Sequence, residues 1–204
     1  MSVRGRFITL EGVDGAGKST HIDFIARRLQ ARGRHPLVTR EPGGTPLAEK
    51  LRALVLTEPM TPLTETLLMF AARADHVERV IRPALESGRW VLCDRFTDAT
   101  AAYQGAGKGV SQDLIQRLAQ ASHPKLLPDR TLIFDCPYDV ARRRLAASGR
   151  TLDRFENEGA EFFDRVRQAY LARAAAEPDR IRLIDATQTI ENIQNTLEEA
   201  ILVD

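Results

Sequence analysis

The sequence has few of the features that mark secreted or membrane-spanning proteins. Among its 204 residues are only two cysteines, Cys93 and Cys136, and both lie in apolar stretches, so we expect buried, reduced thiols rather than a disulfide framework. No apolar run approaches the roughly 20 residues that a membrane span needs. The amino-terminal stretch carries Arg4 and Arg6 and lacks the apolar segment and cleavage site of a signal peptide. These absences predict a cytoplasmic protein with no membrane partner.

The chain also lacks an excess of charge of either sign. Its 29 basic and 28 acidic residues give a net charge of +1. Proteins that bind nucleic acids usually carry a basic excess, because much of their affinity comes from neutralising phosphates. We therefore expect no nucleic-acid partner, although 29 cations leave room for a local basic pocket.

What the chain does contain is an alternation of strand-like and helical segments. Short apolar runs predict strands at 6–11, 36–40, 89–94, 131–135 and 180–185. Apolar residues at three- and four-residue spacing predict helices from Lys18, over 47–55, over 63–86, from about 111 and from about 189. Continuously apolar strands separated by helices are typical of a parallel sheet that is covered on both faces. We predict one α/β domain, 1–204, with three layers and a five-stranded parallel sheet.

Three stretches are harder to assign to this pattern. Residues 97–110 are polar and rich in glycine, and we expect a loop there. Residues 142–158 are rich in arginine and lose their apolar stripe, which fits either a solvated surface loop or a mobile flap over 146–158. Pro83 is expected to kink or weaken the last turn of the long helix.

The strongest motif is GVDGAGKS at 12–19, which matches the phosphate-binding pattern G-x-x-x-x-G-K-[ST]. A strand before it and a helix after it are the context that this motif requires. Its glycines let the backbone wrap a phosphate, and the start of the helix adds the positive end of its dipole. Lys18 is expected to reach the β- and γ-phosphates, and Ser19 to ligate Mg²⁺. The motif predicts that the chain binds a nucleoside triphosphate.

Arginines gather at the ends of predicted elements, where ligands of such sheets bind. One surface arginine is usually solvated, but several around a phosphate-binding loop favour clamps on a second phosphate. This pattern indicates a kinase of a small molecule, because phosphoryl transfer depends on positioning two polyanions among cations. The arginines concerned are Arg40, Arg73, Arg95, Arg150 and Arg154.

Asp94 closes the third predicted strand, directly before Arg95. A carboxylate there is placed to hold water ligands of Mg²⁺, while the arginine can bridge donor and acceptor phosphates. A salt bridge at the strand end is the alternative explanation of this pair.

The residues alone leave other functions open. A kinase of another monophosphate, such as dUMP, UMP or dCMP, would share these patterns. A nucleotide-sensing module would bind ATP without turnover that an acceptor stimulates. A GTPase is less well supported, because the chain has no N-K-x-D element for guanine.

Seven further segments resemble bacterial thymidylate kinases, which phosphorylate dTMP. They read TREPGGT (39–45), LAEKLR (47–52), AAR (71–73), DRF (94–96), TAAYQG (100–105), LDRFE (152–156) and IDAT (184–187). They occur in the family's order and span nearly the whole chain. The resemblance implies a P-loop NTPase fold with a lid, a homodimer, and transfer of the γ-phosphoryl group of ATP to dTMP with Mg²⁺, a step of dTTP biosynthesis.

On the ATP side, the resemblance implies three groups of residues. The phosphates would be held by Gly12, Val13, Asp14, Gly15, Ala16, Gly17, Lys18, Ser19 and Thr20. The adenine would be lined by Arg144, Asp185, Ala186 and Thr187. The catalytic residues would be Asp14, Lys18, Arg95, Arg150 and Arg154, with Ser19 and Asp94 serving Mg²⁺.

On the dTMP side, the implied contacts follow the parts of the nucleotide. The phosphate would meet Arg52, Arg95 and the nearby Arg40, beside the turn of Glu41 and Pro42, with Glu41 orienting Arg95. The thymine would meet Arg73 at its O4, and Thr100 and Gln104 at its edge. Tyr103 would pack where the 2′-OH of a ribose would stand, favouring deoxyribose.

Two positions distinguish this chain within the family pattern. Gly15 stands where some thymidylate kinases have an arginine inside the P-loop, so the missing cation is expected from Arg150 and Arg154 of the lid, the segment at about 146–158. This is the lid-arginine type. Met69 stands where the family usually has an aromatic residue that stacks on the base. Either its thioether packs on the thymine, or the adjacent Phe70 stacks there, or Phe70 belongs to the core.

Overall fold

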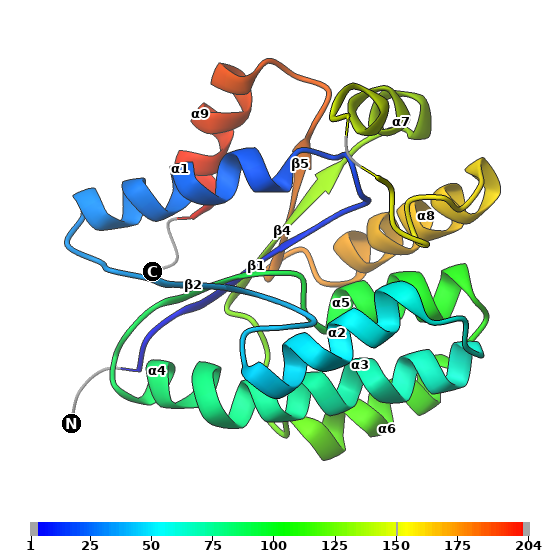
Figure 1. Ribbon diagram of the computed structural model, residues 1–204. Coiled ribbons are helices and arrows are strands. Elements are labelled where there is room, and N and C mark those ends of the chain that lie inside the picture. Colours follow the sequence, from blue (N-terminus) through cyan, green and yellow to red (C-terminus); the bar gives the residue numbers. More distant parts are fainter. Residues whose placement is uncertain (1–3, 150, 202–204) are drawn as a thin grey trace.

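Five short strands lie side by side in the order β2-β3-β1-β4-β5, and every neighbouring pair is parallel. They belong to a computed structural model that describes residues 4–149 and 151–201 (Figure 1). In chain order they are β1 (Phe7–Glu11), β2 (Leu37–Arg40), β3 (Val91–Asp94), β4 (Arg130–Asp135) and β5 (Ile181–Asp185). All five strands predicted from the sequence are confirmed, with ends that differ by one or two residues.

Helices cover both faces of this sheet, which confirms the three-layer α/β fold. In Figure 1, α1 and α9 lie on one side, and α3, α4, α6 and α8 lie on the other. In chain order the helices of the described residues are α1 (Lys18–Ala31), α2 (Pro46–Thr57), α3 (Pro62–His76), α4 (Arg82–Glu86), α5 (Thr97–Thr100), α6 (Gln112–Ser122), α7 (Tyr138–Ala147), α8 (Ala160–Ala176) and α9 (Ile190–Ala200). Among the described helices, none is both long and apolar enough to cross a membrane.

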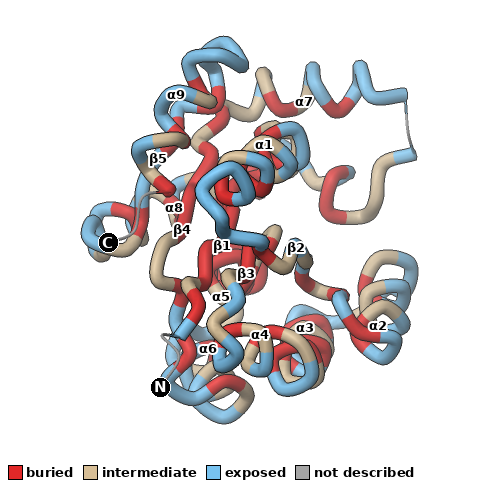
Figure 2. Tube along the Cα trace, turned by 90° about the vertical axis from the view of Figure 1, so that its left-hand side faces the viewer, coloured by how far each residue is buried: buried red, intermediate tan, exposed pale blue. Residues whose placement is uncertain are grey.

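The burial of each strand follows its place in the sheet. The central strand β1 is buried along its whole length, whereas the edge strands β2 and β5 have partly or fully exposed residues. Figure 2 shows the buried stretches gathered on β1, β3 and β4 in the middle of the molecule. Because helices cover both faces, the central strands read as continuous apolar runs. Cys93 and Cys136 are both buried and free, as expected.

Several helices begin where a threonine side chain caps them. Thr45, Thr61 and Thr189 each accept a hydrogen bond from a backbone N–H in the first turn of α2, α3 and α9, at 3.0 to 3.2 Å. Such caps satisfy N–H groups that have no partner inside the helix. The predicted start of the last helix near Thr189 is confirmed.

The long helix predicted over 63–86 does not stop or break at Pro83. A π-helical segment, Val77–Ile81, connects α3 to α4, and Pro83 lies in the first turn of α4. In the register of a regular α-helix the proline ring collides with the carbonyl group four residues earlier, and for this reason the sequence predicts a kink or a weakened turn. The wider π-helical turns change that register and let the chain remain helical up to Glu86.

The predicted loop at 97–110 is wrong for most of its length. It forms α5 and a second π-helical segment, Ala101–Gly107, and most of its residues are buried. Its glycines permit close packing: a Cβ atom at Gly105 would lie 2.2 Å from Nε2 of Gln112, and one at Gly107 would lie 2.5 Å from the ring of Phe162. The small and polar residues that suggested a loop therefore belong to a helix pressed between α6 and α8.

The arginine-rich stretch at 142–158 divides into two parts. Its first part, up to Ala147, belongs to α7, and the described residues that follow, 148–149 and 151–158, are irregular. Helix α8 was not predicted from the sequence, although Phe162, Val166 and Tyr170 recur at four-residue spacing on its buried face. This helix carries a residue that reaches the candidate site.

Candidate active site

The phosphate-binding motif forms the turn between β1 and α1, at the carboxyl end of the central strand. Gly12, Gly15 and Gly17 have positive φ values of 128°, 82° and 95°. A Cβ atom at Gly12 would lie 2.5 Å from the carbonyl oxygen of Phe134, and one at Gly15 would lie 2.5 Å from that of Ala141. At Gly12 and Gly15 only glycine combines the conformation with such close neighbours, so the backbone itself forms the cradle.

Lys18 begins α1 and folds back over this turn. Its Nζ donates to the carbonyl oxygens of Gly12 at 3.0 Å and Val13 at 3.2 Å. Burial and the nearby charge of Arg95 lower the pKa of Lys18. The side chain is thus held against the loop, in the position from which the motif's lysine contacts a triphosphate.

Two adjoining hollows open at the carboxyl end of the sheet. The larger holds about 1530 Å³ of empty space including its mouth, and the smaller about 570 Å³. Of the nine residues predicted to hold the ATP phosphates, 12–20, seven line the larger hollow. They are Asp14, Gly15, Ala16, Gly17, Lys18, Ser19 and Thr20. Gly12 and Val13 do not line either hollow. Both hollows share Asp14, Glu41, Arg52, Arg95 and Asp153.

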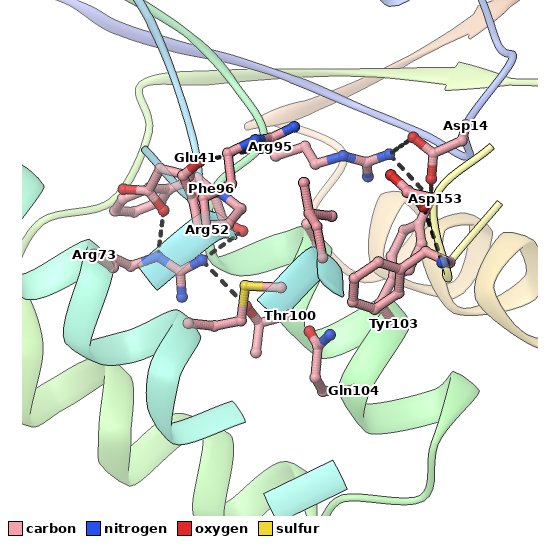
Figure 3. A pocket seen from close by; sticks show the side chains of 15 residues that line it. Asp14, Glu41, Arg52, Arg73, Arg95, Phe96, Thr100, Tyr103, Gln104 and Asp153 are labelled. Carbon is pink, nitrogen blue, oxygen red and sulfur yellow. Dashed lines mark hydrogen bonds and ion pairs between the residues drawn. The ribbon is translucent and has the colours of Figure 1, made fainter. Parts of the chain in front are cut away.

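Arg95 stands at the junction of the two hollows, next to Asp14 (Figure 3). Its Nη2 donates to Oδ1 of Asp14 at 2.7 Å and to the hydroxyl of Tyr103 at 3.0 Å, while its Nη1 donates to the hydroxyl of Tyr170 at 3.3 Å. Its backbone has a φ of 70°, which is unusual for a residue with a side chain. Such strain is found mainly where surrounding contacts hold a functional residue in place.

Asp14 is held ionised in this pair. Burial alone would raise its pKa, but the charges of Arg95 and Lys18 outweigh that effect and lower the pKa to about 2. The hydroxyl of Tyr103 adds a hydrogen bond to Oδ2 at 2.8 Å. The junction thus presents a fixed carboxylate beside a fixed guanidinium group.

Arg73 closes the far end of the smaller hollow. Its Nε donates to Oε2 of Glu41 at 2.6 Å, and its Nη2 donates to the carbonyl oxygen of Phe96 and to Oγ1 of Thr100, both at 3.1 Å (Figure 3). Nη1 is buried and has no hydrogen-bond partner among the described residues. A buried N–H group without a partner is costly, so this nitrogen marks a place for a ligand's acceptor atom.

The expectation that Glu41 orients Arg95 is wrong. Glu41 faces α3, where it pairs with Arg73 and contacts Nδ1 of His76 at 3.0 Å. Burial alone would raise the pKa of Glu41, but the charge of Arg73 and the contact with His76 keep it lowered. Arg95 turns the other way, toward Asp14, because its carboxylate partner comes from the phosphate-binding turn.

Most of the other residues predicted for the acceptor line the smaller hollow. They are Pro42, Arg52, Met69, Thr100, Tyr103 and Gln104. Arg52 donates from Nη1 to the carbonyl oxygen of Pro42 at 3.1 Å. Arg40 instead lines the larger hollow and pairs with Glu49 at the surface.

Of the two candidates for stacking, Met69 lines the smaller hollow and Phe70 does not. Phe70 is buried, and the guanidinium carbon of Arg73 lies 4.8 Å from its ring centre. Phe70 therefore supports Arg73 from the core, and Met69 offers its thioether to the hollow.

The larger hollow also contains the residues predicted to serve Mg²⁺. Ser19 and Asp94 both line it, and Oδ1 of Asp94 is buried without a hydrogen-bond partner among the described residues. No group of three histidine, cysteine, aspartate or glutamate side chains that could hold a metal ion occurs in the described part of the chain. Mg²⁺ is commonly bound through one or two protein oxygens together with water and phosphate, and these two residues fit that requirement.

Arg144 connects the phosphate-binding turn with the end of β5. Its Nη1 donates to the carbonyl oxygen of Ala16 at 3.3 Å, and its Nη2 to that of Ala186 at 2.8 Å. Asp185 and Thr187 bond to each other in the same turn and do not line the larger hollow. Arg144 itself lines it, on the side expected for the adenine.

The two predicted lid arginines have different outcomes. Arg150 lies outside the described residues. A contact with the ATP phosphates would need Arg154 to line the larger hollow, and it does not. Its side chain instead donates to the carbonyl oxygen of Val55 and to Oε2 of Glu65. Glu65 is fully buried and attracts Arg154 toward α3.

Several residues at this site were not identified from the sequence. Glu11 and Tyr170 contact each other beside Arg95, His76 contacts Glu41, and Asp153 lines both hollows. Glu11 had a recognisable signal, since it is the charged residue that directly precedes the phosphate-binding turn. Burial, reinforced by the negative charge of Asp98, raises the pKa of Glu11 to about 7.

Comparisons with known proteins agree with this arrangement. A family model described as thymidylate kinase matches residues 10–197. A thymidylate kinase of Bordetella petrii is 58% identical over 97% of this chain and 95% of its own, and one of Methylobacillus flagellatus is 56% identical over 94% of both. The crystal structure of thymidylate kinase from Ehrlichia chaffeensis has a TM-score of 0.78 and 31% identity, covering 96% of this chain and 98% of its own. The chain, with its P-loop and its arginine-lined second hollow, therefore belongs to the thymidylate kinase family.

Proposed function

We propose that this chain transfers the γ-phosphoryl group of ATP to dTMP, giving dTDP and ADP, in dTTP synthesis in the cytoplasm. The observation that carries the proposal is the pair of adjoining hollows that meet at Arg95 and Asp14. One hollow contains the phosphate-binding turn. The other ends at Arg73, whose buried Nη1 has no hydrogen-bond partner within the described part of the chain. Family membership supports the same reaction.

On the donor side, ATP places its phosphates on the turn at 12–19, where backbone N–H groups and Lys18 bind them. Lys18 then exchanges its bonds to the carbonyl oxygens of Gly12 and Val13 for phosphate oxygens. Ser19, together with Asp94 through water, would hold Mg²⁺, which would neutralise charge on the phosphates.

On the acceptor side, dTMP places its base against Met69, with O4 accepting from Nη1 of Arg73. Its phosphate lies at the junction, where Arg52 and Arg95 bind it. Tyr103, fixed by its bond to Asp14, fills the space beside the sugar and favours deoxyribose. In-line transfer then needs only that the two phosphates face each other across Arg95.

An acceptor screen at fixed Mg-ATP, followed by coupled release of ADP, tests the proposal. We expect dTMP to give a higher kcat/KM than dUMP, UMP and dCMP. A clear preference for a cytosine or a ribose acceptor contradicts the assignment. ATP binding without turnover that an acceptor stimulates indicates a nucleotide sensor instead.

Two substitutions test the roles of the junction and the cradle. Arg95→Ala is expected to lower kcat/KM by several orders of magnitude, about 10³-fold or more, because it removes the cation between the phosphates. Lys18→Met is expected to abolish ATP turnover in the same way. Arg79→Ala is a matched control, because Arg79 is exposed and forms an ion pair only with Asp75 among the described residues. Near-normal turnover in folded Arg95→Ala protein refutes its role.

The proposed homodimer has a candidate surface on α2 and α3, which pack against each other. Leu47 and Leu54 on α2, and Leu63 and Leu67 on α3, are exposed large apolar side chains. Leucines gathered on neighbouring helices favour contact with a second copy. Light scattering on the purified chain tests this, since a monomer at micromolar concentration contradicts it.

A further inference from the structure

Glu11 is a buried carboxylate that lies beside the site without lining either hollow of the described structure. It ends β1, directly before the phosphate-binding turn. Its Oε1 accepts from the backbone N–H of Phe96 at 2.7 Å, and its Oε2 accepts from the hydroxyl of Tyr170 at 2.8 Å. Both oxygens of one carboxylate are therefore committed to residues that flank or contact Arg95.

The first of these bonds acts on the backbone of Arg95. The N–H of Phe96 belongs to the peptide group that follows Arg95, and the N–H of Arg95 donates to the carbonyl oxygen of Leu10 at 2.8 Å. Bonds on both sides thus attach the strained residue, with its φ of 70°, to the end of β1. A left-handed residue persists only where its surroundings fix it in this manner.

The second bond acts on the side chain of Arg95. When Glu11 is ionised, above its pKa of about 7, the hydroxyl of Tyr170 donates its one hydrogen to Glu11, so its oxygen accepts Nη1 of Arg95 at 3.3 Å. Tyr103 repeats this arrangement on the other side, since it donates to Asp14 and accepts from Nη2 of Arg95. Each carboxylate thereby orients a tyrosine hydroxyl toward the guanidinium group.

We infer that Glu11 and Tyr170 are positioning residues for Arg95, a role that rests on the proposed kinase function. Glu11 fixes the backbone of Arg95 through Phe96, and it fixes the guanidinium group through Tyr170. Neither residue touches the substrates. Their effect is to aim Arg95 at the junction before ATP and the acceptor bind, which saves reorganisation during transfer.

Tyr170→Phe is the sharpest perturbation, because it removes one hydroxyl and keeps the buried ring. We expect kcat/KM for dTMP to fall about 10- to 100-fold, as for the loss of a hydrogen bond to a charged group, with KM for ATP changed less than about threefold. Tyr138→Phe is the matched control: that ring packs on Phe163 in an edge-to-face contact away from Arg95, and we expect no loss.

A double-mutant cycle separates positioning from a structural role. In the Arg95→Lys background, the guanidinium fork is gone, so adding Tyr170→Phe should lower kcat/KM less than about twofold. An equal loss in both backgrounds overturns the inference, and so does full activity of Tyr170→Phe. Glu11→Gln provides a second route, because its amide group must donate to Tyr170 and so reverses the hydroxyl's role. If neither variant folds at 25 °C, both residues serve stability and the inference fails.

A failure of the positioning role of Glu11 and Tyr170 can be told apart from a failure of the proposed kinase function. A wild-type chain that does not phosphorylate dTMP refutes the proposed function alone. The inference is then decided by a crystal structure of Tyr170→Phe. Arg95 displaced from Asp14 supports the inference, and Arg95 unchanged overturns it.

Discussion

The ion pair between Glu41 and Arg73 offers a quantitative test of how the smaller hollow is held. Both side chains are almost fully buried, at 2% and 3% exposure, and their contact measures 2.6 Å. Glu41→Gln keeps the shape but leaves the guanidinium charge without its partner. Breaking a buried pair in this way costs about 3–5 kcal/mol, because an uncompensated charge remains inside the protein.

This loss is large against the stability of a whole domain, which is typically about 5–15 kcal/mol. At about 2–4 °C per kcal/mol for a chain of this size, the midpoint of thermal unfolding should fall by about 6–20 °C. Thermal unfolding followed by circular dichroism at pH 7.5 measures it. We also expect KM for dTMP to rise about tenfold, since Glu41 holds the arginine that reads the base.

Two further variants test whether the loss in Glu41→Gln comes from the stranded charge of Arg73. Glu49→Gln changes the same functional group in a surface pair with Arg40, and a pair of that kind contributes only about 0–1 kcal/mol. Adding Arg73→Gln to Glu41→Gln removes the stranded charge and should restore much of the stability but not the affinity for dTMP. A midpoint shift below about 2 °C for Glu41→Gln, or a double variant that melts below the single one, refutes the argument.

Three other predictions concern His123, Gly15 and Cys93. Burial, with the charge of Arg73, lowers the pKa of His123 from 6.5 to about 4. Because the unfolded chain takes up this proton near pH 6.5, stability should fall by up to about 3 kcal/mol as pH falls from 6.5 to 4, and urea unfolding of His123→Gln should lack that part. Gly15→Ala forces a Cβ atom against the carbonyl oxygen of Ala141 at a φ of 82°, so it should lower stability by about 1–3 kcal/mol and raise KM for ATP; an unchanged melting curve contradicts this. Burial raises the pKa of Cys93 well above its ordinary value, so a thiol reagent should leave it unmodified until urea unfolds the chain.

The strands and the phosphate-binding turn could be predicted from the sequence because local rules determine them. Apolar runs flanked by helical periodicity have one stable arrangement, a covered parallel sheet. The glycines of the turn likewise have a purely local reason, their positive φ values and close neighbours. Arg95 was identified because it directly follows β3, where the carboxyl ends of the strands meet.

The partners of these residues could not be predicted, because they depend on how distant elements pack. Glu41 follows β2, and the local sequence does not say whether Arg73 or Arg95 will face it. The choice is made when α3 packs below that turn and presents Arg73. Tyr170 lies 75 positions from Arg95 and reaches it only because α8 packs against the segment 101–107.

Arg154 shows the same limit, because the partner of its charge depends on how distant elements pack. Arg154 now bonds to the buried Glu65, which also accepts from Gln104 at 2.7 Å and from Lys108 at 2.8 Å. If Arg154 leaves for the phosphates of ATP, the carboxylate keeps both other donors, so the move does not strand a buried charge. Gln104 also lines the smaller hollow, so an acceptor that hydrogen-bonds to Gln104 would compete with Glu65 for the same side chain. The sequence predicts a lid arginine, but the described structure pairs Arg154 with Glu65, a residue 89 positions away that the local sequence does not identify as its partner.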